Sequence, residues 1–177
     1  RQSARLKKLI EDLLEASKAS TGNVEMHMEA CDAAVMISQV VGEYQDKLQA
    51  QDIEIVVNEA KNPANIMADG RHLWRVFDNI MSNICKYTQD HTRVYVNVED
   101  AGDQVRMIFK NISKYPLNIS SDELMERFVR GDASRNTEGH GLGLSIASSL
   151  TALMDGQLTI DIDGDLFKIT VAMKKQA

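Results

Sequence analysis

Three glycines at alternate positions, Gly139, Gly141 and Gly143, stand directly before a predicted helix. Residues without a Cβ let the backbone bend freely and approach a ligand until its N–H groups make contact. Apolar residues of segment 142–153 then follow steps of four, four and three, which predicts a helix, and Gly156 is expected in its C-terminal cap. A glycine turn that opens a helix favours anion binding, most naturally of a phosphate. The turn alone also fits close packing against a strand.

A second feature lies on the helix predicted from about residue 71 to 87, which begins after Asp69-Gly70. Asn79, Asn83 and Lys86 are spaced four and three residues apart, so their side chains share one face. Amide oxygens suit a hard cation such as Mg²⁺, which takes few protein ligands and keeps several waters, and an ammonium group suits phosphate oxygens. Taken alone, the pattern also fits a solvated helix face.

The rest of the chain is organised by shorter signals. In order they predict a helix over 1–20, strands over 24–28 and 53–57 around a helix from Asp32 to 50, a turn at Asn62-Pro63, a hairpin of 93–99 with 104–111, a short helix over 120–129, a polar loop over 130–138, and a hairpin of 157–163 with 165–173. Antiparallel strands with interleaved helices predict an α+β fold, a two-layer α/β sandwich. Its mixed, largely antiparallel sheet is covered on one face by helices and preceded by one amphipathic helix.

The opening helix has an apolar stripe with three-and-four spacing, made by Leu6, Leu9, Ile10, Leu13 and Ser17. Such a stripe needs a partner surface, and no second matching helix lies nearby in the sequence. We therefore expect it to face a helix of an absent segment or of another subunit, with docking onto its own domain as the alternative. The chain begins without methionine, so we expect a piece of a longer protein.

Composition restricts the class of protein. The net charge is −6 with no basic block, which argues against nucleic-acid or anionic-membrane binding. Cys31 and Cys85 fit no zinc pattern and favour a reduced, cytosolic setting. No apolar run approaches the roughly 20 residues of a membrane span, so any membrane part of the parent protein is expected outside this sequence.

Several motifs in the same order resemble those of the ATP-binding catalytic domain of bacterial sensor histidine kinases, in the superfamily that includes gyrase, Hsp90 and MutL. Segment 79–88 resembles the N box, 125–130 the F box and 139–144 the G2 box, and 131–138 would be the ATP lid. The opening helix resembles the end of the second helix of the dimerisation and phosphoacceptor hairpin. The resemblance implies two parts, the hairpin remnant at 1–22 and the catalytic domain at 23–177.

The resemblance also implies ATP and Mg²⁺ as cofactors. Asn83 would hold the metal, and Asn79 and Lys86 would contact phosphates. Tyr87 would pack near the adenine or ribose, and Arg130 would lie near the terminal phosphate. Asn79, Lys86 and Arg130 are thus the expected catalytic residues.

In the G2 box, Gly139, Gly141 and Gly143 would let the lid close over the triphosphate. Leu142 and Leu144 would form its hydrophobic support.

One position departs from the family pattern. Asn111 stands where the family has an aspartate that accepts a hydrogen bond from the adenine amino group, and no glycine follows it. An amide oxygen can still accept this bond, but it is neutral, so we expect a weaker interaction than with a carboxylate.

The implied reaction transfers the γ-phosphoryl group of ATP to a histidine on the first hairpin helix, for relay to a response-regulator aspartate. None of the chain's histidines has the context of that acceptor; they are His27, His72, His91 and His140. The expected location is the cytosolic portion of a membrane sensor, with the hairpin supplied in cis or trans within a homodimer.

Two alternatives stay open. A non-catalytic switch module would bind nucleotide and hold a partner protein. A superfamily ATPase would need a water-activating carboxylate one turn before Asn83, where this chain has Asn79; the neighbouring Asp78 lies about 100° round the helix and is expected to point away.

Overall fold

The computed structural model describes residues 2–59, 65–117 and 142–176. Its elements are α1 (Gln2–Thr21), β1 (Glu29–Asp32), α2 (Ala33–Gln49), β2 (Glu54–Asn58), β3 (Asn65–Ala68), α3 (Gly70–Tyr87), β4 (Arg93–Ala101), β5 (Gln104–Ile112), α5 (Gly143–Leu153), β6 (Gln157–Asp163) and β7 (Leu166–Lys174). The turn expected at Asn62-Pro63, the helix expected over 120–129 and the lid expected over 131–138 lie outside the described residues.

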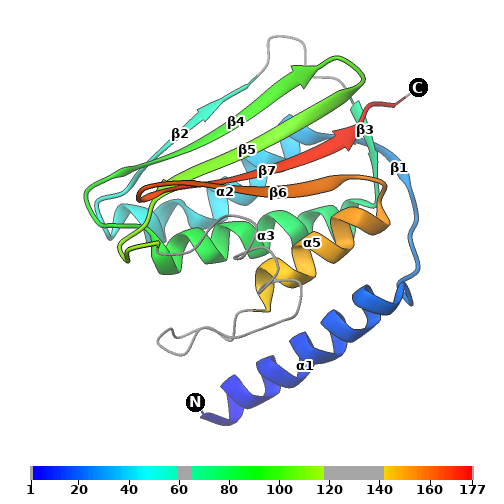
Figure 1. Cartoon of the computed structure of the whole chain (residues 1–177), viewed down its shortest axis with the longest axis horizontal. Coiled ribbons are helices and arrows are strands. Elements are labelled where there is room, and N and C mark those ends of the chain that lie inside the picture. The colour runs from blue at the N-terminus through cyan, green and yellow to red at the C-terminus, as the bar shows by residue number, and fades with distance from the viewer. Residues whose placement is uncertain (1, 60–64, 118–141, 177) are drawn as a thin grey trace.

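A five-stranded sheet forms one layer, in the order β2-β4-β5-β7-β6. Only the β2–β4 pair is parallel, and the other three pairs are antiparallel. Helices α2, α3 and α5 cover one face of this sheet (Figure 1). The predicted fold class, a largely antiparallel mixed sheet with helices on one face, is therefore confirmed.

The core lies between the sheet and these helices. Strand β5 presents Val105, Met107 and Phe109 to the helices, all at most 2% exposed. Helix α3 supplies the facing apolar residues, among which Phe77 lies with its ring centroid 5.9 Å from that of Phe109. Because α3 and β5 are held together by this core, the polar side chains at their ends have fixed relative positions.

Two aspartates begin helices as the sequence predicts. Asp32 accepts a hydrogen bond from the N–H of Val35 at 3.1 Å, and Asp69 accepts from those of Arg71 and His72 at 3.0 and 3.2 Å. Asp69 also accepts from the N–H of His27 at 2.8 Å. Burial by itself raises the pKa of the Asp69 carboxyl, but these N–H groups hold it below its ordinary value.

The strand expected over 24–28 is wrong. The strand is β1, at Glu29–Asp32, and it pairs antiparallel with β3, which the sequence did not reveal. Val24 and Met26 pack against the core, but their segment is irregular. The N–H of the following His27 bonds to the Asp69 carboxylate instead of to a neighbouring strand. In α2, the apolar residue Val35 is 51% exposed.

The end of α5 shows why a glycine stands at 156. The residue with positive φ is Asp155, at 61°, and the N–H groups of Asp155 and Gly156 bond to the carbonyls of Ala152 and Thr151. This is the hydrogen-bond pattern of a Schellman cap, with aspartate in the left-handed position. A Cβ on Gly156 would lie 2.8 Å from the carbonyl oxygen of Ala172, so this glycine permits close packing of α5 on β7.

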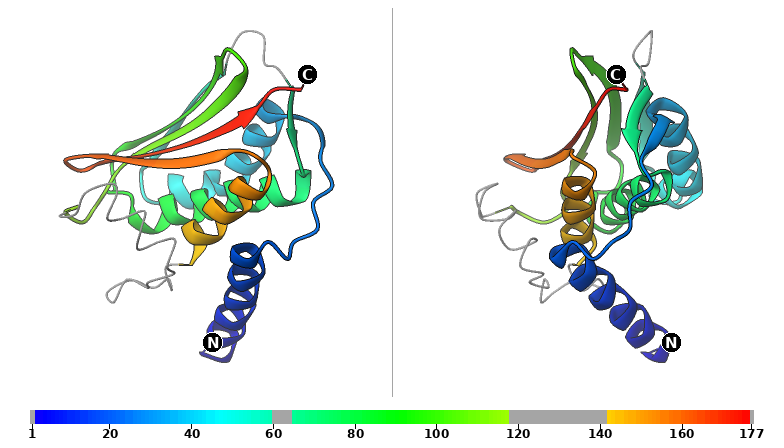
Figure 2. Two further views of the ribbon diagram at one scale, coloured as in Figure 1. Left: turned by 45° about the vertical axis from the view of Figure 1, so that its right-hand side comes forward. Right: turned by 90° about the vertical axis from the view of Figure 1, so that its right-hand side faces the viewer.

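Helix α1 leaves the body at an angle and contacts it along its C-terminal half (Figure 2). Asp12 and Ala19 are buried there, and Arg75 of α3 donates to Asp12 at 3.0 Å and to Glu15 at 2.7 Å. Much of the predicted stripe faces away, since Leu6, Ile10 and Leu13 are each about half exposed. Helix α1 thus docks on its own domain through a neighbouring face that shares only Leu9 with the stripe, and a partner for the exposed part of the stripe stays a prediction. Among the described residues, no helix has the length and apolar character needed to span a bilayer.

Candidate functional site

The polar face of α3 passes from the interior to the surface along the helix. Asn79 is 7% exposed, Asn83 and Tyr87 are half-buried, and Lys86 is exposed. The face predicted from the spacing therefore exists, and its first amide is buried among core residues. A buried amide is costly unless its hydrogen-bonding groups find partners, which makes Asn79 a candidate binding residue.

Asn79 meets the start of α5. A Cβ placed on Gly143 would lie 3.8 Å from the Cβ and Cγ of Asn79, so the glycine turn and the α3 amide are in direct proximity. The Nδ2 of Asn79 is buried and has no hydrogen-bond partner among the described residues. The structure thus brings together the two features that the sequence had suggested separately, and it leaves a donor unpaired between them.

The N-terminus of α5 differs from those of α2 and α3. Both of those helices are capped by an aspartate side chain, whereas the residue at this position of α5 is Leu142, whose side chain makes no capping hydrogen bond. The first N–H groups of α5 and the positive end of its dipole therefore suit an anion. Leu142 and Leu144 themselves are buried, at 5% and 3% exposed.

A second buried amide, that of Asn111, lies on β5 beside the C-terminal end of α3. Asn111 continues the helix-facing side of β5 after Met107 and Phe109, and it is 3% exposed. Its Nδ2 donates to the Oγ1 of Thr88, the residue that ends α3, at 3.0 Å. Its Oδ1 is buried without a partner among the described residues. An acceptor is thus available at a position where the strand pattern calls for an apolar residue.

The two groups without described partners are separated along the direction of α3, one on the helix itself and the other on β5 beside the helix end. Asn79 and Thr88 are nine residues apart, which corresponds to about 13 Å of helix rise. One end offers a buried donor beside the N-terminus of α5, where the Leu142 side chain makes no capping bond, and the other offers a buried acceptor on β5. This arrangement fits an elongated ligand with an anionic end and a hydrogen-bond donor at the opposite end.

The carboxylate next to Asn79 is directed elsewhere. Asp78 accepts a hydrogen bond from the Tyr44 hydroxyl at 2.6 Å and lies 3.8 Å from the Arg75 guanidinium. Burial, with the hydrogen bond to Asp78, raises the pKa of the Tyr44 hydroxyl well above its usual range, so Tyr44 stays a donor. Asp78 therefore points away from the face of Asn83, as predicted; it is directed toward Tyr44 of α2 and is not placed to activate a water at Asn83.

The remaining predicted site residues cannot be placed. Arg130, Gly139 and Gly141 lie outside the described residues, as does the whole F-box segment. The structure adds Thr88, which closes the N-box segment and holds Asn111. Its hydroxyl at a helix end is a weak sequence signal, because threonine is common at such positions for structural reasons alone.

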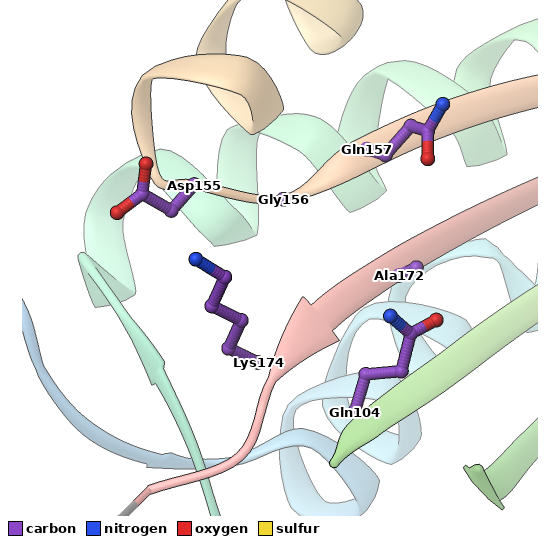
Figure 3. Close-up of a pocket in the computed structure, with 6 residues that line it drawn as sticks. All are labelled: Gln104, Asp155, Gly156, Gln157, Ala172 and Lys174. Carbon is purple, nitrogen blue, oxygen red and sulfur yellow. The ribbon is translucent and has the colours of Figure 1, made fainter. Parts of the chain in front are cut away.

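A shallow pocket lies at the opposite end of α5 from Gly143. Figure 3 shows its lining residues, which come from the α5–β6 connection, β5, β6 and β7. Its residues are Gln104, Asp155, Gly156, Gln157, Ala172 and Lys174. None of these residues lies on the polar face of α3, and Asn111 is not among them. This pocket is therefore separate from the candidate site.

Comparison with known proteins places this geometry in a family. The sequence model of one protein family, the histidine kinase-, DNA gyrase B- and HSP90-like ATPases, matches residues 68–176, which include α3, β5 and α5. The probable sensor protein PcoS of Escherichia coli is 28% identical over 96% of this chain, and the chain spans 36% of its length.

Two solved structures share the fold. Full-length ShkA in complex with AMPPNP aligns with a TM-score of 0.83 at 21% identity, covering 100% of this chain and 38% of that one. Histidine kinase ThkA in complex with the response regulator protein TrrA aligns at 0.79 and 19% identity, covering 99% and 48%. Because the family model matches more than half of the chain, the chain belongs to the histidine kinase-, DNA gyrase B- and HSP90-like ATPase family.

Proposed function

We propose that this chain is the ATP-binding catalytic domain of a sensor histidine kinase. Among the described residues three buried side-chain amide atoms have no hydrogen-bond partner, and two of them, Asn79 Nδ2 in the middle of α3 and Asn111 Oδ1 on β5 beside the end of α3, lie inside the family-matched region; these two carry the proposal. Unsatisfied buried polar atoms are rare in stable folds, and a ligand that pairs with both explains why they are retained.

The residues fit a nucleoside triphosphate lying along α3. Asn111 Oδ1 accepts from the amino group of the base, and Tyr87 packs beside the base or ribose. Asn79 and Lys86, with the first N–H groups of α5, hold phosphate oxygens. Gly139, Gly141 and Arg130 complete the phosphate end according to the family pattern.

Mg²⁺ fits the same face through one oxygen ligand. Asn83 lies one turn after Asn79 and is half-buried, so its amide oxygen can reach a metal that also contacts phosphates and water. Bound there, the metal would neutralise charge on the phosphates. The contribution of the chain is then to position the triphosphate and exclude water, since Asp78 is engaged with Tyr44.

The phosphoryl acceptor is a histidine on the hairpin whose second helix ends in α1. Helix α1 is tied to α3 by Arg75, which sits one turn before Asn79, so the hairpin would approach the phosphate end of the site. A response regulator receives the phosphoryl group, as the complex of ThkA with TrrA suggests for a protein of this fold. The setting we propose is the cytosolic part of a membrane sensor; the relative PcoS is a probable sensor protein.

Phosphotransfer in trans tests the proposal. The chain is mixed with the parent protein's hairpin and isotopically labelled Mg-ATP, and label on the hairpin histidine is measured for wild type and Asn83→Ala. We expect transfer by the wild type, and a larger loss of transfer than of ADP binding in the variant, because the metal matters most where charge develops. Gln39→Ala, at an exposed position of α2, is the control.

The possible outcomes separate the proposal from its alternatives. Tight Mg-ATP binding without transfer would indicate the non-catalytic switch module. Equal transfer by wild type and Asn83→Ala, with the same magnesium dependence, would remove Asn83 from the metal site.

A further inference from the structure

A short hydrogen-bond chain fixes the side chain of Asn111. The Thr88 Oγ1 lies 2.6 Å from the carbonyl oxygen of Ile84, one turn earlier in α3. A carbonyl oxygen only accepts, so the single hydroxyl proton of Thr88 must lie between these two oxygens. The same Thr88 Oγ1 lies 3.0 Å from the amide of Asn111 and has only lone pairs left to offer it.

The hydroxyl proton of Thr88, donated to the Ile84 carbonyl, therefore decides which way the Asn111 amide faces. The NH₂ group must face Thr88, because a carbonyl oxygen there would meet the lone pairs of Oγ1. The Oδ1 is consequently turned to the other side, where it has no partner among the described residues. Thr88 is fully buried, at 0% exposed, so water cannot replace either bond without opening the structure.

The backbone holds Thr88 and Asn111 at this separation. The N–H of Thr88 bonds to the Ile84 carbonyl at 3.0 Å, and the N–H of Gln89 bonds to the carbonyl of Ile112 at 2.8 Å. Thr88 also forms an antiparallel bridge with Ser113. The end of α3 and the end of β5 are thus joined directly. The hydrogen bonds that link Ile84, Thr88 and Asn111 are therefore held in a rigid arrangement.

We propose that Thr88 is a positioning residue that sets the polarity of Asn111 and thereby selects a base carrying a hydrogen-bond donor. A purine with a 6-amino group can donate to Oδ1, whereas a 6-oxo purine would place oxygen against oxygen. If the Asn111 amide could turn over, its NH₂ group would face the ligand and the preference would reverse. The inference rests on the proposed function, which supplies the nucleotide as the ligand class.

A purely structural role for Thr88 makes a different prediction. If Thr88 only closed the helix, removing its hydroxyl would lower stability and weaken all nucleotides alike. If it orients Asn111, the ratio of affinities for 6-amino and 6-oxo purine nucleotides must change. That ratio is independent of a uniform loss of affinity, so it separates the two roles.

The experiment is calorimetric titration of Mg-ATP and Mg-ITP into wild type, Thr88→Val and Thr88→Ser. Inosine triphosphate is chosen because it differs from ATP at the base only by the 6-oxo group and the ring proton that accompanies it. We expect wild type to prefer ATP by at least about tenfold, since the wrong base leaves buried polar groups unpaired. Thr88→Val has nearly the same shape without the hydroxyl and should reduce this preference to about threefold or less. Thr88→Ser restores the hydroxyl and should restore the preference.

The outcomes are distinguishable. An unchanged preference in folded Thr88→Val would overturn the positioning role, and so would a wild type that binds ATP and ITP equally, although the latter leaves nucleotide binding intact. A wild type that binds neither would overturn the proposed function and this inference with it.

A measurement on the unliganded wild type avoids dependence on the variants. NMR of the side-chain amides should show one Asn111 Nδ2 proton exchanging much more slowly with solvent than those of Asn97, which lies on the open face of the sheet. Equally fast exchange would contradict the hydrogen-bond chain.

Discussion

Replacing Asn79 by leucine should stabilise the unliganded protein and abolish nucleotide binding. The side chain has the same branching as leucine, the residue is 7% exposed, and its Nδ2 has no partner among the described residues. An unpaired buried polar group costs about 1–3 kcal/mol, and leucine removes that cost. A Cβ placed on Gly143 would lie 3.8 Å from the Cβ and Cγ of Asn79. Because glycine has no Cβ, this space is open to the new methyl groups.

The size of the effect follows from this cost. Leucine is slightly larger than asparagine, so some repacking strain offsets the gain, and we expect a net stabilisation of about 1 kcal/mol. For a domain of this size that raises the Tm by about 2–4 °C. Saturating Mg-ADP at a hundred times its Kd should stabilise wild type by about 2.7 kcal/mol but leave Asn79→Leu unchanged.

Thermal melts with and without Mg-ADP measure both effects. Gln39→Leu, which replaces an exposed helix amide on α2, is the matched control and should change stability by less than about 0.5 kcal/mol while keeping the ligand response. If Asn79→Leu instead lowered the stability of the unliganded protein by 1 kcal/mol or more, beyond what the control shows, Asn79 would have structural partners and the argument from its unpaired donor would fail.

Three further predictions concern the framework around the site. Gly156→Ala should destabilise the fold by about 1–3 kcal/mol in urea denaturation, because its Cβ would lie 2.8 Å from a β7 carbonyl; an unchanged midpoint would refute the close packing. Arg75→Ala should speed amide exchange in α1 about tenfold or more but not in β5, since its bonds to carboxylates of α1 are lost; uniform exchange rates would refute the tie. The folded-state pKa of Asp69 is lowered, so its contribution is present above about pH 4 and lost as pH falls through that pKa. The stability difference between wild type and Asp69→Asn should therefore shrink between pH 6 and pH 3, and a constant difference would contradict the assignment.

Local sequence signals predicted the elements whose determinants are close together in the chain. Helix α3 follows from Asp69 as a cap and from apolar residues at helical spacing, and both β-hairpins follow from alternation around short polar turns. The pairing of β1 with β3 was missed because each strand has only four residues and the paired residues are far apart in the chain; Ala30 and Met67, for example, are 37 positions apart. Such short pairings are decided by tertiary contacts that no local pattern records.

The site was predictable in its residue types and not in its hydrogen bonding. The spacing of Asn79 and Asn83 identified the polar face of α3, and the glycine turn identified the start of α5. That Asn79 is buried against Gly143, and that Asn111 is held by Thr88, depends on the packing of α5 on α3 and on the register of β5. These relations join residues 23 to 64 positions apart, so the sequence alone could not show which amide atoms stay unpaired.

The central claim is that a nucleotide lies along α3 between Asn79 and Asn111, and side-chain amide NMR during titration with Mg-ADP tests it most directly. We predict that the Asn79 and Asn111 amide signals shift together with a single affinity, while those of Gln104 and Gln157, which line the separate pocket of Figure 3, do not move. Shifts confined to the two glutamines, or an unchanged pair of asparagine signals at saturating nucleotide, would contradict it.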